Sequence, residues 1–145
     1  FASERKASFL KTLKKNKIRF NKNYYASVKL EEPEKSFEII RKMLSKNKKI
    51  TSIICSTEFS ALSAIKACNY LNLEIGKDIS IITFDGPLVK DLSSPPITAI
   101  SFPVQELGKR AIKILLKGHS NKKHYSNFQA KSDIIERGSV HQVRD

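Results

Sequence analysis

The chain has 145 residues, of which 40% are hydrophobic and 28% are charged. This length allows one ordinary domain with a sizeable core, and the hydrophobic share is typical of a globular protein rather than a disordered one. No apolar run approaches the roughly 20 residues that a membrane-spanning helix needs. The start, Phe-Ala-Ser-Glu-Arg-Lys, has neither an initiator methionine nor a signal pattern. We therefore expect the chain to have been cut from a longer polypeptide.

The formal net charge is +13, from 27 Lys and Arg against 14 Asp and Glu. Such a balance is compatible with contact to nucleic acid or to a membrane surface. The basic residues are scattered, however, and their small clusters at 14–17, 46–49 and 122–124 fall at predicted helix ends or in loops, where lysine suits the helix dipole. Aromatic residues interleaved for base stacking are lacking. We favour a solvated basic surface, with direct nucleic-acid binding as the alternative.

Cysteine is scarce: Cys55 falls in a predicted strand and Cys68 in a predicted helix. A metal site needs more ligands than these two, so no metal is expected. Both cysteines are interpreted as small buried apolar residues, with a disulfide as the alternative. This usage favours a cytoplasmic location.

Apolar residues at helical spacing predict helices, and short β-branched runs predict strands. The expected elements are helices at 3–16, from 33, at 58–72 and at 103–117, and strands at 24–30, 50–55, 79–84, 97–101 and 128–136. Pro33 suits the first turn of its helix, and Ser56 or Thr57 can cap the next one. Strands that alternate with helices imply an α/β fold with a doubly wound, mostly parallel sheet.

The strand at 79–84 is a nearly unbroken apolar run that ends in Asp85 and Gly86. Such a run is typical of a parallel strand covered on both faces. In open α/β sheets, ligands bind at the carboxyl ends of the strands. The Asp85 carboxylate can accept several hydrogen bonds, for example from two sugar hydroxyls. Asp85 is therefore a candidate ligand-binding residue, with a turn or cap role as the alternative.

An enzyme is not expected. His119, His124 and His141 fall in predicted loops or in the tail, so none is placed to act as a general base. Neither a GxGxxG motif nor a phosphate-binding GxxxxGK loop occurs, and no cofactor is expected. The acids within 31–34 suit the start of a helix rather than a catalytic pair.

Four short motifs follow one another: Ile-Ser-Ile-Ile-Thr-Phe-Asp at 79–85, Pro-Pro-Ile-Thr-Ala-Ile at 95–100, Glu-Leu-Gly-Lys-Arg-Ala at 106–111 and Ile-Ile-Glu-Arg-Gly-Ser at 134–139. Their order and spacing resemble the C-terminal half of a lac repressor (LacI/GalR) family transcriptional regulator, over about residues 5–139. The resemblance implies a periplasmic-binding-protein-like fold of type I, with two lobes and an effector in the cleft between them. It assigns 1–100 to the C-terminal lobe, 101–120 to a crossover strand and helix of the N-terminal lobe, and 121–145 to a return strand and tail.

The resemblance also implies site residues. Arg5 stands at the arginine of the family's Arg-x-x-Gly-Phe/Trp motif, with Ser8 in place of glycine; the alternative is a surface arginine on a helix. Thr57 and Glu58 stand where many members have Asn-Asp, a departure that bears on which effector binds. Capping of the next helix also explains Thr57. With Asp85, these residues form the expected effector-binding set.

The implied function is the effector-sensing and dimerisation part of a DNA-binding regulator that responds to a small molecule such as a sugar. Operator DNA would be bound through a helix-turn-helix that this chain lacks. A homodimer or larger assembly is expected, because the 58–72 helix is apolar around more than one stripe. The expected interface residues are Phe59, Leu62, Ile65, Pro95 and Pro96. The alternative is a ribose-type periplasmic solute-binding protein of a transporter, which has the same fold.

Overall fold

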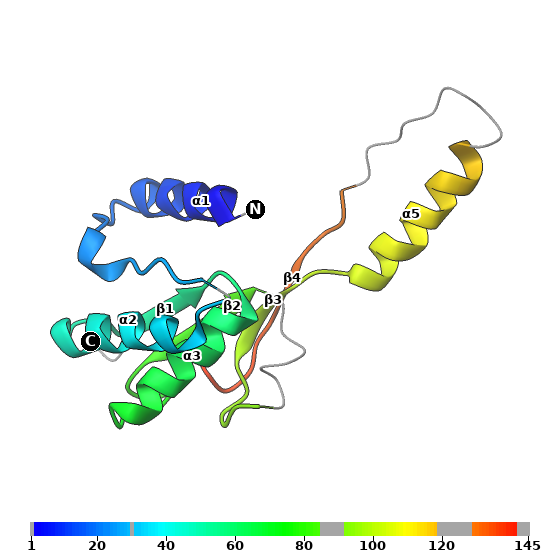
Figure 1. The fold of residues 1–145 in the computed structure, drawn as a ribbon. Helices are drawn as coiled ribbons and strands as arrows, with labels where there is room; N and C mark the ends of the chain where they lie inside the picture. Colours follow the sequence, from blue (N-terminus) through cyan, green and yellow to red (C-terminus); the bar gives the residue numbers. More distant parts are fainter. Residues whose placement is uncertain (1, 30, 85–91, 119–128, 142–145) are drawn as a thin grey trace.

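The computed structural model describes residues 2–29, 31–84, 92–118 and 129–141 (Figure 1). The helices are α1 (Ala2–Lys15), α2 (Pro33–Lys46), α3 (Glu58–Tyr70) and α5 (Val104–Gly118), with a 3₁₀ turn, η1 (Lys22–Tyr24). The strands are β1 (Ser52–Cys55), β2 (Ser80–Phe84), β3 (Thr98–Ser101) and β4 (Asp133–Ile135). Among the residues described, no helix combines the length and apolar content that crossing a membrane requires.

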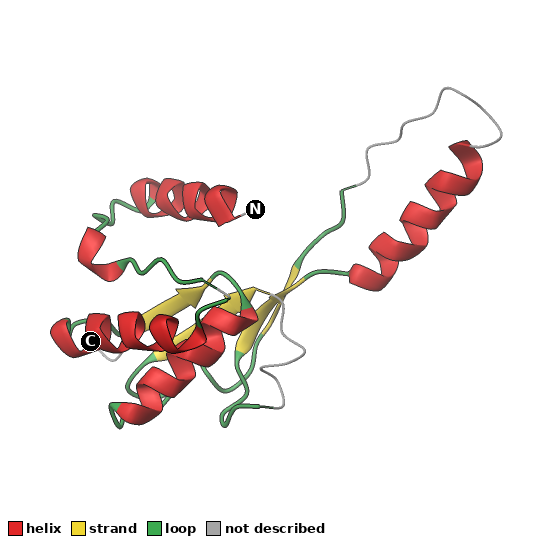
Figure 2. Cartoon of the chain, viewed as in Figure 1, coloured by secondary structure: helices red, strands yellow, loops and turns green. Residues whose placement is uncertain are grey.

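Within the described residues the strands form one sheet in the order β1-β2-β3-β4 (Figure 2). β1, β2 and β3 run parallel, and β4 pairs antiparallel with β3. The expected α/β fold with a mostly parallel sheet is confirmed. The register sets Cys55 beside Thr83 and Phe84 beside Ile100. The parallel strands therefore end at one common edge of the sheet.

The prediction of a strand at 24–30 is wrong for the residues of this range that the structure describes. Tyr24 ends a 3₁₀ turn, and no strand follows it before Leu30, which lies outside the described residues. The Tyr25 backbone is extended, and Ala26 and Val28 pack against the core, whereas Tyr24, which begins the alternation, is 45% exposed. A strand also needs a neighbour to complete its hydrogen-bond ladder. The described sheet ends at β1 and provides none here.

The strand expected at 50–55 is shorter than predicted and is not buried on both faces. β1 begins at Ser52, and although Cys55 is buried, the Ile54 side chain is 53% exposed. Successive side chains of a strand point to opposite faces of the sheet, and the face that carries Ile54, opposite to that of Cys55, is left open here by the described residues. The last strand is also shorter than the expected 128–136, since only Asp133–Ile135 pairs with β3 and residue 128 lies outside the described part.

The core lies between α3 and the sheet. α3 contacts β1 and β2, and its buried face consists of small residues, which let the helix backbone approach the strands closely. The fully buried side chains of this layer are Ala61, Ala64, Ala67, Cys68, Ile79 and Ile81. α2 packs on α3, where the Phe37 and Tyr70 rings meet edge to face with their centres 5.8 Å apart. One helix is thus held by the sheet on one side and by α2 on another.

α5 projects away from the sheet (Figure 1). Its sequence is amphipathic, yet its apolar side chains are exposed, for example Val104, Ile112, Leu115 and Leu116. An apolar stripe on a helix is normally buried against another element. α5 therefore carries a surface that the described residues leave uncovered.

Candidate functional site

The candidate site lies at the edge where the parallel strands end. β1 ends at Cys55 and β2 at Phe84, and these ends are adjacent because the two strands are paired in parallel. Ser56 and Thr57 leave the sheet from the first strand, and Asp85 follows the second in sequence. Asp85 lies outside the described residues, so its expected part in the site stays a prediction.

Arg5 reaches this edge from the N-terminal part of α1. Its guanidinium carbon lies 4.3 Å from the centre of the Phe84 ring and 5.6 Å from the centre of the Phe102 ring. Its Nη1 donates a hydrogen bond to the carbonyl oxygen of Ser56, the residue after β1. One side chain therefore contacts the ends of β1 and β2 and the segment after β3. Arg5 is at least 79 positions away in sequence from both phenylalanines, yet these contacts place its side chain at the strand ends.

Thr57 caps α3. Its Oγ1 accepts a hydrogen bond from the Ser60 amide at 3.2 Å, and its own amide donates to Ser60 Oγ at 3.1 Å. These reciprocal bonds satisfy backbone donors that a helix start leaves unpaired. The capping interpretation of Thr57 is confirmed, and the half-buried Glu58 occupies the first turn, where a carboxylate suits the helix dipole. Any contact of either residue with a ligand stays a prediction.

Two phenylalanines at this edge were not among the predicted site residues. The rings of Phe84 and Phe102 are close to parallel, at 19°, with their centres 6.5 Å apart. Both side chains are half-buried. A shallow depression of about 510 Å³ adjoins Phe102 at the start of α5. Their positions in the sequence could have identified them as site residues, because Phe84 ends β2 and Phe102 follows β3 directly.

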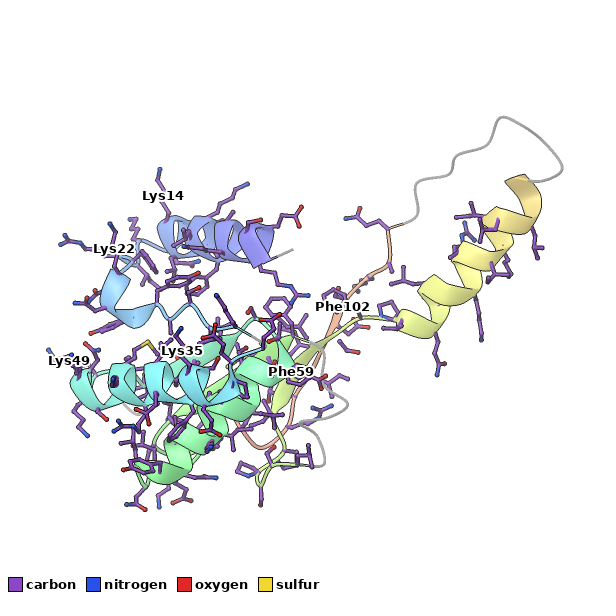
Figure 3. The ribbon with its side chains drawn as sticks, in the orientation of Figure 1. Lys14, Lys22, Lys35, Lys49, Phe59 and Phe102 are labelled. Atoms are coloured by element: carbon purple, nitrogen blue, oxygen red, sulfur yellow. The ribbon has the colours of Figure 1, made fainter. Side chains whose placement is uncertain are left out.

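Figure 3 shows Phe59 and Phe102 on the side of the molecule where the strands end, and Lys14, Lys22 and Lys49 toward the opposite end. Lys14 lies in the last turn of α1, Lys22 begins η1, and Lys49 follows α2. Among the described residues, the candidate site is therefore lined by Arg5, Phe84 and Phe102, and not by these three lysines.

Cys55 ends β1 at the edge of the candidate site, and Cys68 lies in α3. Cys55 and Cys68 are buried free thiols, and burial raises the pKa of Cys55 to about 12 and that of Cys68 to about 11. Neither is a thiolate at neutral pH, so neither is a ready nucleophile or metal ligand. His141 Nδ1 lies 2.9 Å from Ser80 Oγ, at the start of β2, while His119 and His124 lie outside the described residues. Across 2–29, 31–84, 92–118 and 129–141, no three His, Cys, Asp or Glu side chains gather as metal ligands would.

The expected interface residues differ in exposure. Phe59 and Pro96 are exposed, while Leu62, Ile65 and Pro95 are half-buried. Leu62 and Ile65 pack against the core. Part of the apolar surface that predicted a second partner for α3 is therefore used within the chain, since α3 contacts both the sheet and α2. The interface itself stays a prediction.

Known proteins resemble this chain in sequence. Residues 1–140 match the periplasmic binding protein-like domain family. The HTH-type transcriptional repressor PurR of Aliivibrio salmonicida (strain LFI1238) is 34% identical over 105 residues, which make up 72% of this chain and 32% of that protein. PurR of Haemophilus influenzae is 30% identical over 146 residues, covering 98% of this chain and 43% of that protein. The chain spans less than half the length of these curated relatives.

The fold has solved counterparts as well. A sugar-binding transcriptional regulator of the LacI family from Escherichia coli, solved with phosphate, superposes with a TM-score of 0.81 at 22% identity, over 95% of this chain and 49% of that one. At this identity the likeness shows a shared fold. The four sequence motifs resemble those of LacI/GalR regulators. The family match over 1–140 and the regulators named above point to the same family, and the strand order fits its fold. The chain belongs to the periplasmic binding protein-like domain family, in the form found in LacI/GalR regulators.

Proposed function

We propose that this chain is the effector-sensing part of a LacI-type transcriptional regulator and that a small molecule binds at the carboxyl edge of its sheet. The observation that carries the proposal is the placement of Arg5, which contacts Ser56, Phe84 and Phe102 at that edge. Ligands of open α/β sheets bind at this edge. The relatives named above are transcriptional regulators, which supports a regulatory role and, with it, a role without catalysis.

The proposed effector contacts are Arg5, Thr57, Glu58 and Asp85. Arginine supplies a planar fork of donors, and carboxylates supply acceptors, so the set suits a ligand that carries both hydroxyl and acceptor oxygens. The Escherichia coli regulator of the same fold is described as sugar-binding, which supports a sugar as the effector.

The uncovered stripe of α5 supports the proposed division into lobes. In this proposal 1–100 and the return strand within 121–145 form the C-terminal lobe, while 101–120 belongs to the N-terminal lobe. The exposed Val104 and Leu115 of α5 would then be buried against the sheet of that second lobe. A ligand in the cleft that contacts both lobes favours their closed arrangement and shifts the population of DNA-binding forms.

The proposed partners are operator DNA, reached through a helix-turn-helix outside this chain, and a second copy of the chain that contacts the exposed side of α3. A regulator of this kind acts in the cytoplasm. The ribose-type solute-binding alternative has the same fold, but the curated relatives named above are regulators and do not favour it.

The test uses the complete gene product that contains this chain. Calorimetry against pyranoses, pentoses and nucleobases identifies a ligand, and fluorescence anisotropy with DNA from upstream of its own gene measures operator affinity. We expect one compound to change operator affinity by about 5-fold to 150-fold, and Arg5→Gln to remove that response. Lys11→Gln, on the same helix, is the matched control. Operator affinity that no compound changes, or equal responses in Arg5→Gln and Lys11→Gln, would contradict the proposal.

A further inference from the structure

A second depression lies between η1 and the C-terminal half of α2, away from the strand ends. It is shallow, and its volume is about 500 Å³. Figure 3 shows Lys22, one of its lining residues, on the side of the molecule away from Phe102. The described residues that line this depression come from η1, the segment after it, α2 and the residue that caps α2: Lys22, Asn23, Tyr25, Ala26, Ile39, Lys42, Met43, Lys46 and Asn47.

The depression is apolar at its base and basic at its rim. Ile39 and Met43 are half-buried, whereas Lys22, Lys42 and Lys46, here called the rim lysines, are exposed. None of the described lining residues is acidic. An apolar surface framed by charges of one sign is complementary to an apolar group flanked by charges of the opposite sign.

The acids close to this part of α2 are paired with other cations. Glu38 Oε2 lies 2.7 Å from Arg41 Nη2, and Glu32 Oε2 lies 2.7 Å from Lys35 Nζ. None of the ion pairs among the described residues includes a rim lysine. The rim therefore presents positive charge that the described chain does not pair with a carboxylate.

Capping of α2 does not account for the rim. Asn47 Nδ2 donates a hydrogen bond to the Met43 carbonyl at 2.8 Å, and the Asn47 amide donates to the Leu44 carbonyl at 3.3 Å. These bonds satisfy carbonyls that a helix end leaves unpaired. The helix dipole favours cations in the last turn of α2, but Lys22 belongs to η1. Lysines from two separate elements thus converge on one apolar depression.

The aromatic residue of this depression, Tyr25, is already in contact with other side chains. The Lys6 ammonium lies 4.0 Å from the centre of its ring, and the Phe20 ring meets it edge to face at 6.4 Å. Bases of single-stranded nucleic acid stack on free aromatic faces. Peptide carboxylates need no such face, and they pair with lysine ammonium groups in variable geometry. Methionine is flexible and packs against apolar groups of varied shape.

We propose that this depression is the docking surface for an acidic peptide segment of a partner protein, in which an apolar side chain is flanked by glutamates or aspartates. The apolar side chain packs on Ile39 and Met43, and the carboxylates pair with the rim lysines. Attraction between opposite charges speeds such an association, and salt weakens it. The surface lies outside the proposed effector site, so this inference does not depend on the proposed function.

The test measures binding to the complete gene product that contains this chain by fluorescence anisotropy. The probe is a short fluorescein-labelled peptide with the repeat Glu-Leu-Glu. Comparison probes of the same length are polyglutamate, a Lys-Leu-Lys repeat and single-stranded DNA. The charge variant is Lys42→Glu with Lys46→Glu, and the apolar variant is Met43→Gln. The matched control, Lys113→Glu with Lys131→Glu, reverses two exposed lysines in α5 and before β4.

We expect the Glu-Leu-Glu peptide to bind and the charge variant to weaken that binding at least tenfold, which corresponds to about 1.4 kcal/mol. Met43→Gln should weaken it about threefold to fivefold, or roughly 0.7–1 kcal/mol. The matched control should stay within about twofold of the parent. Polyglutamate should bind more weakly than the probe, and the Lys-Leu-Lys peptide should not bind. Circular dichroism establishes that each variant folds.

A Glu-Leu-Glu peptide that does not bind, or equal affinities in the charge variant and the matched control, would overturn the proposal. Polyglutamate that binds as tightly as the probe would overturn it too, because net charge alone would then explain the binding. Tighter binding of single-stranded DNA, lost in the charge variant, would assign the surface to nucleic acid instead. Self-association of the parent by light scattering, lost in the charge variant, would assign it to a second copy. The effector response, measured separately by calorimetry, is independent of all these outcomes.

Discussion

Ser139 and Ile81 exchange two hydrogen bonds across 58 positions of sequence. Ser139 Oγ donates to the Ile81 carbonyl at 2.6 Å, and the Ile81 amide donates to the Ser139 carbonyl at 3.0 Å. The same hydroxyl oxygen accepts the Thr98 amide at 2.8 Å. One fully buried serine of the tail thus bridges β2 and β3. This contact gives the terminal Ile-Glu-Arg-Gly-Ser motif a structural role: it fixes the spacing of the strands that end at the candidate site.

Replacing this serine tests that role. Ser139→Ala removes the donor to Ile81 and the acceptor of the Thr98 amide in a fully buried place. The free energy of unfolding should fall by about 1–3 kcal/mol, because a buried polar group left without its partner keeps its desolvation cost. Urea denaturation measures the change, with Ser132→Ala, at an exposed position, as control. Equal stability of the two variants would show that the bridge contributes nothing.

A pair of glycine substitutions should give opposite results. Gly76 has a φ of +81°, and a Cβ there would lie 2.3 Å from the Gly138 carbonyl oxygen, so Gly76→Ala should destabilise the fold by about 1–3 kcal/mol. Gly108 lies within α5, and a Cβ there meets nothing within 4 Å. Gly108→Ala should stabilise the chain by up to about 1 kcal/mol. Thermal unfolding of both variants measures the contrast, and a Gly76→Ala protein as stable as the parent would contradict it.

Local patterns predicted most elements because helix and strand periodicities are properties of single segments. Pro33 does begin α2, and the apolar run before Asp85 is β2, with Ile81 fully buried. What a segment pairs with is not a local property. The alternation that includes Val28 predicted a strand, but no strand pairs with it among the described residues. Ile54 is exposed because the described residues do not cover its face of the sheet, opposite to that of Cys55.

At the candidate site, too, local features could be predicted from the sequence and contacts between distant segments could not. Arg5 was predicted from the family motif alone, since nothing in the periodicity of α1 indicates that its guanidinium reaches two strand ends. Capping by Thr57 was predicted from residue type, because a cap depends on residues three positions apart. Phe102 was missed: a phenylalanine after a short strand has no pattern of its own, and its meaning depends on Phe84 lying beside it.

The buried thiols make stability depend on pH. Burial raises the pKa of Cys55 from an ordinary 9.0 to about 12, and that of Cys68 to about 11. Since the folded-state pKa values exceed the unfolded one, the stabilisation by neutral thiols is complete below about pH 9 and is lost as the pH rises toward the folded-state values. Between pH 8 and pH 10 the two thiols should account for a loss on the order of 2–3 kcal/mol.

Urea denaturation at the two pH values measures that loss. The double variant Cys55→Ala, Cys68→Ala serves as the comparison, because tyrosines and lysines titrate in both proteins and cancel. The parent should lose more stability than the variant over this range. Identical losses would show that the thiols ionise in the folded state as they do in the unfolded chain.

Asp85 follows Phe84, the last residue of β2, and the Arg5 guanidinium lies over the Phe84 ring. If its carboxylate accepts hydrogen bonds from the effector, Asp85→Ala should weaken binding by roughly 1.5–3 kcal/mol, the range for hydrogen bonds to a charged group. Calorimetry with the bound compound measures the affinity. Asp133→Ala, at an exposed position of β4, is the matched control. An affinity that Asp85→Ala leaves unchanged would remove this residue from the site.

Phe59 is the most direct test of assembly. Its side chain is 53% exposed, in the first turn of α3, whereas Leu62 and Ile65 pack against the core. A charged residue there perturbs an interface without entering the core, and two-fold pairing through one surface is the commonest form of self-association. We expect the parent to sediment as a dimer or larger species at micromolar concentration, and Phe59→Asp to shift it toward the monomer. Asn69→Asp, at the far end of α3 and also exposed, should leave the sedimentation coefficient unchanged. Circular dichroism establishes that both variants fold. A monomeric parent, or a Phe59→Asp variant that sediments as the parent does, would place the interface elsewhere or show that α3 forms none.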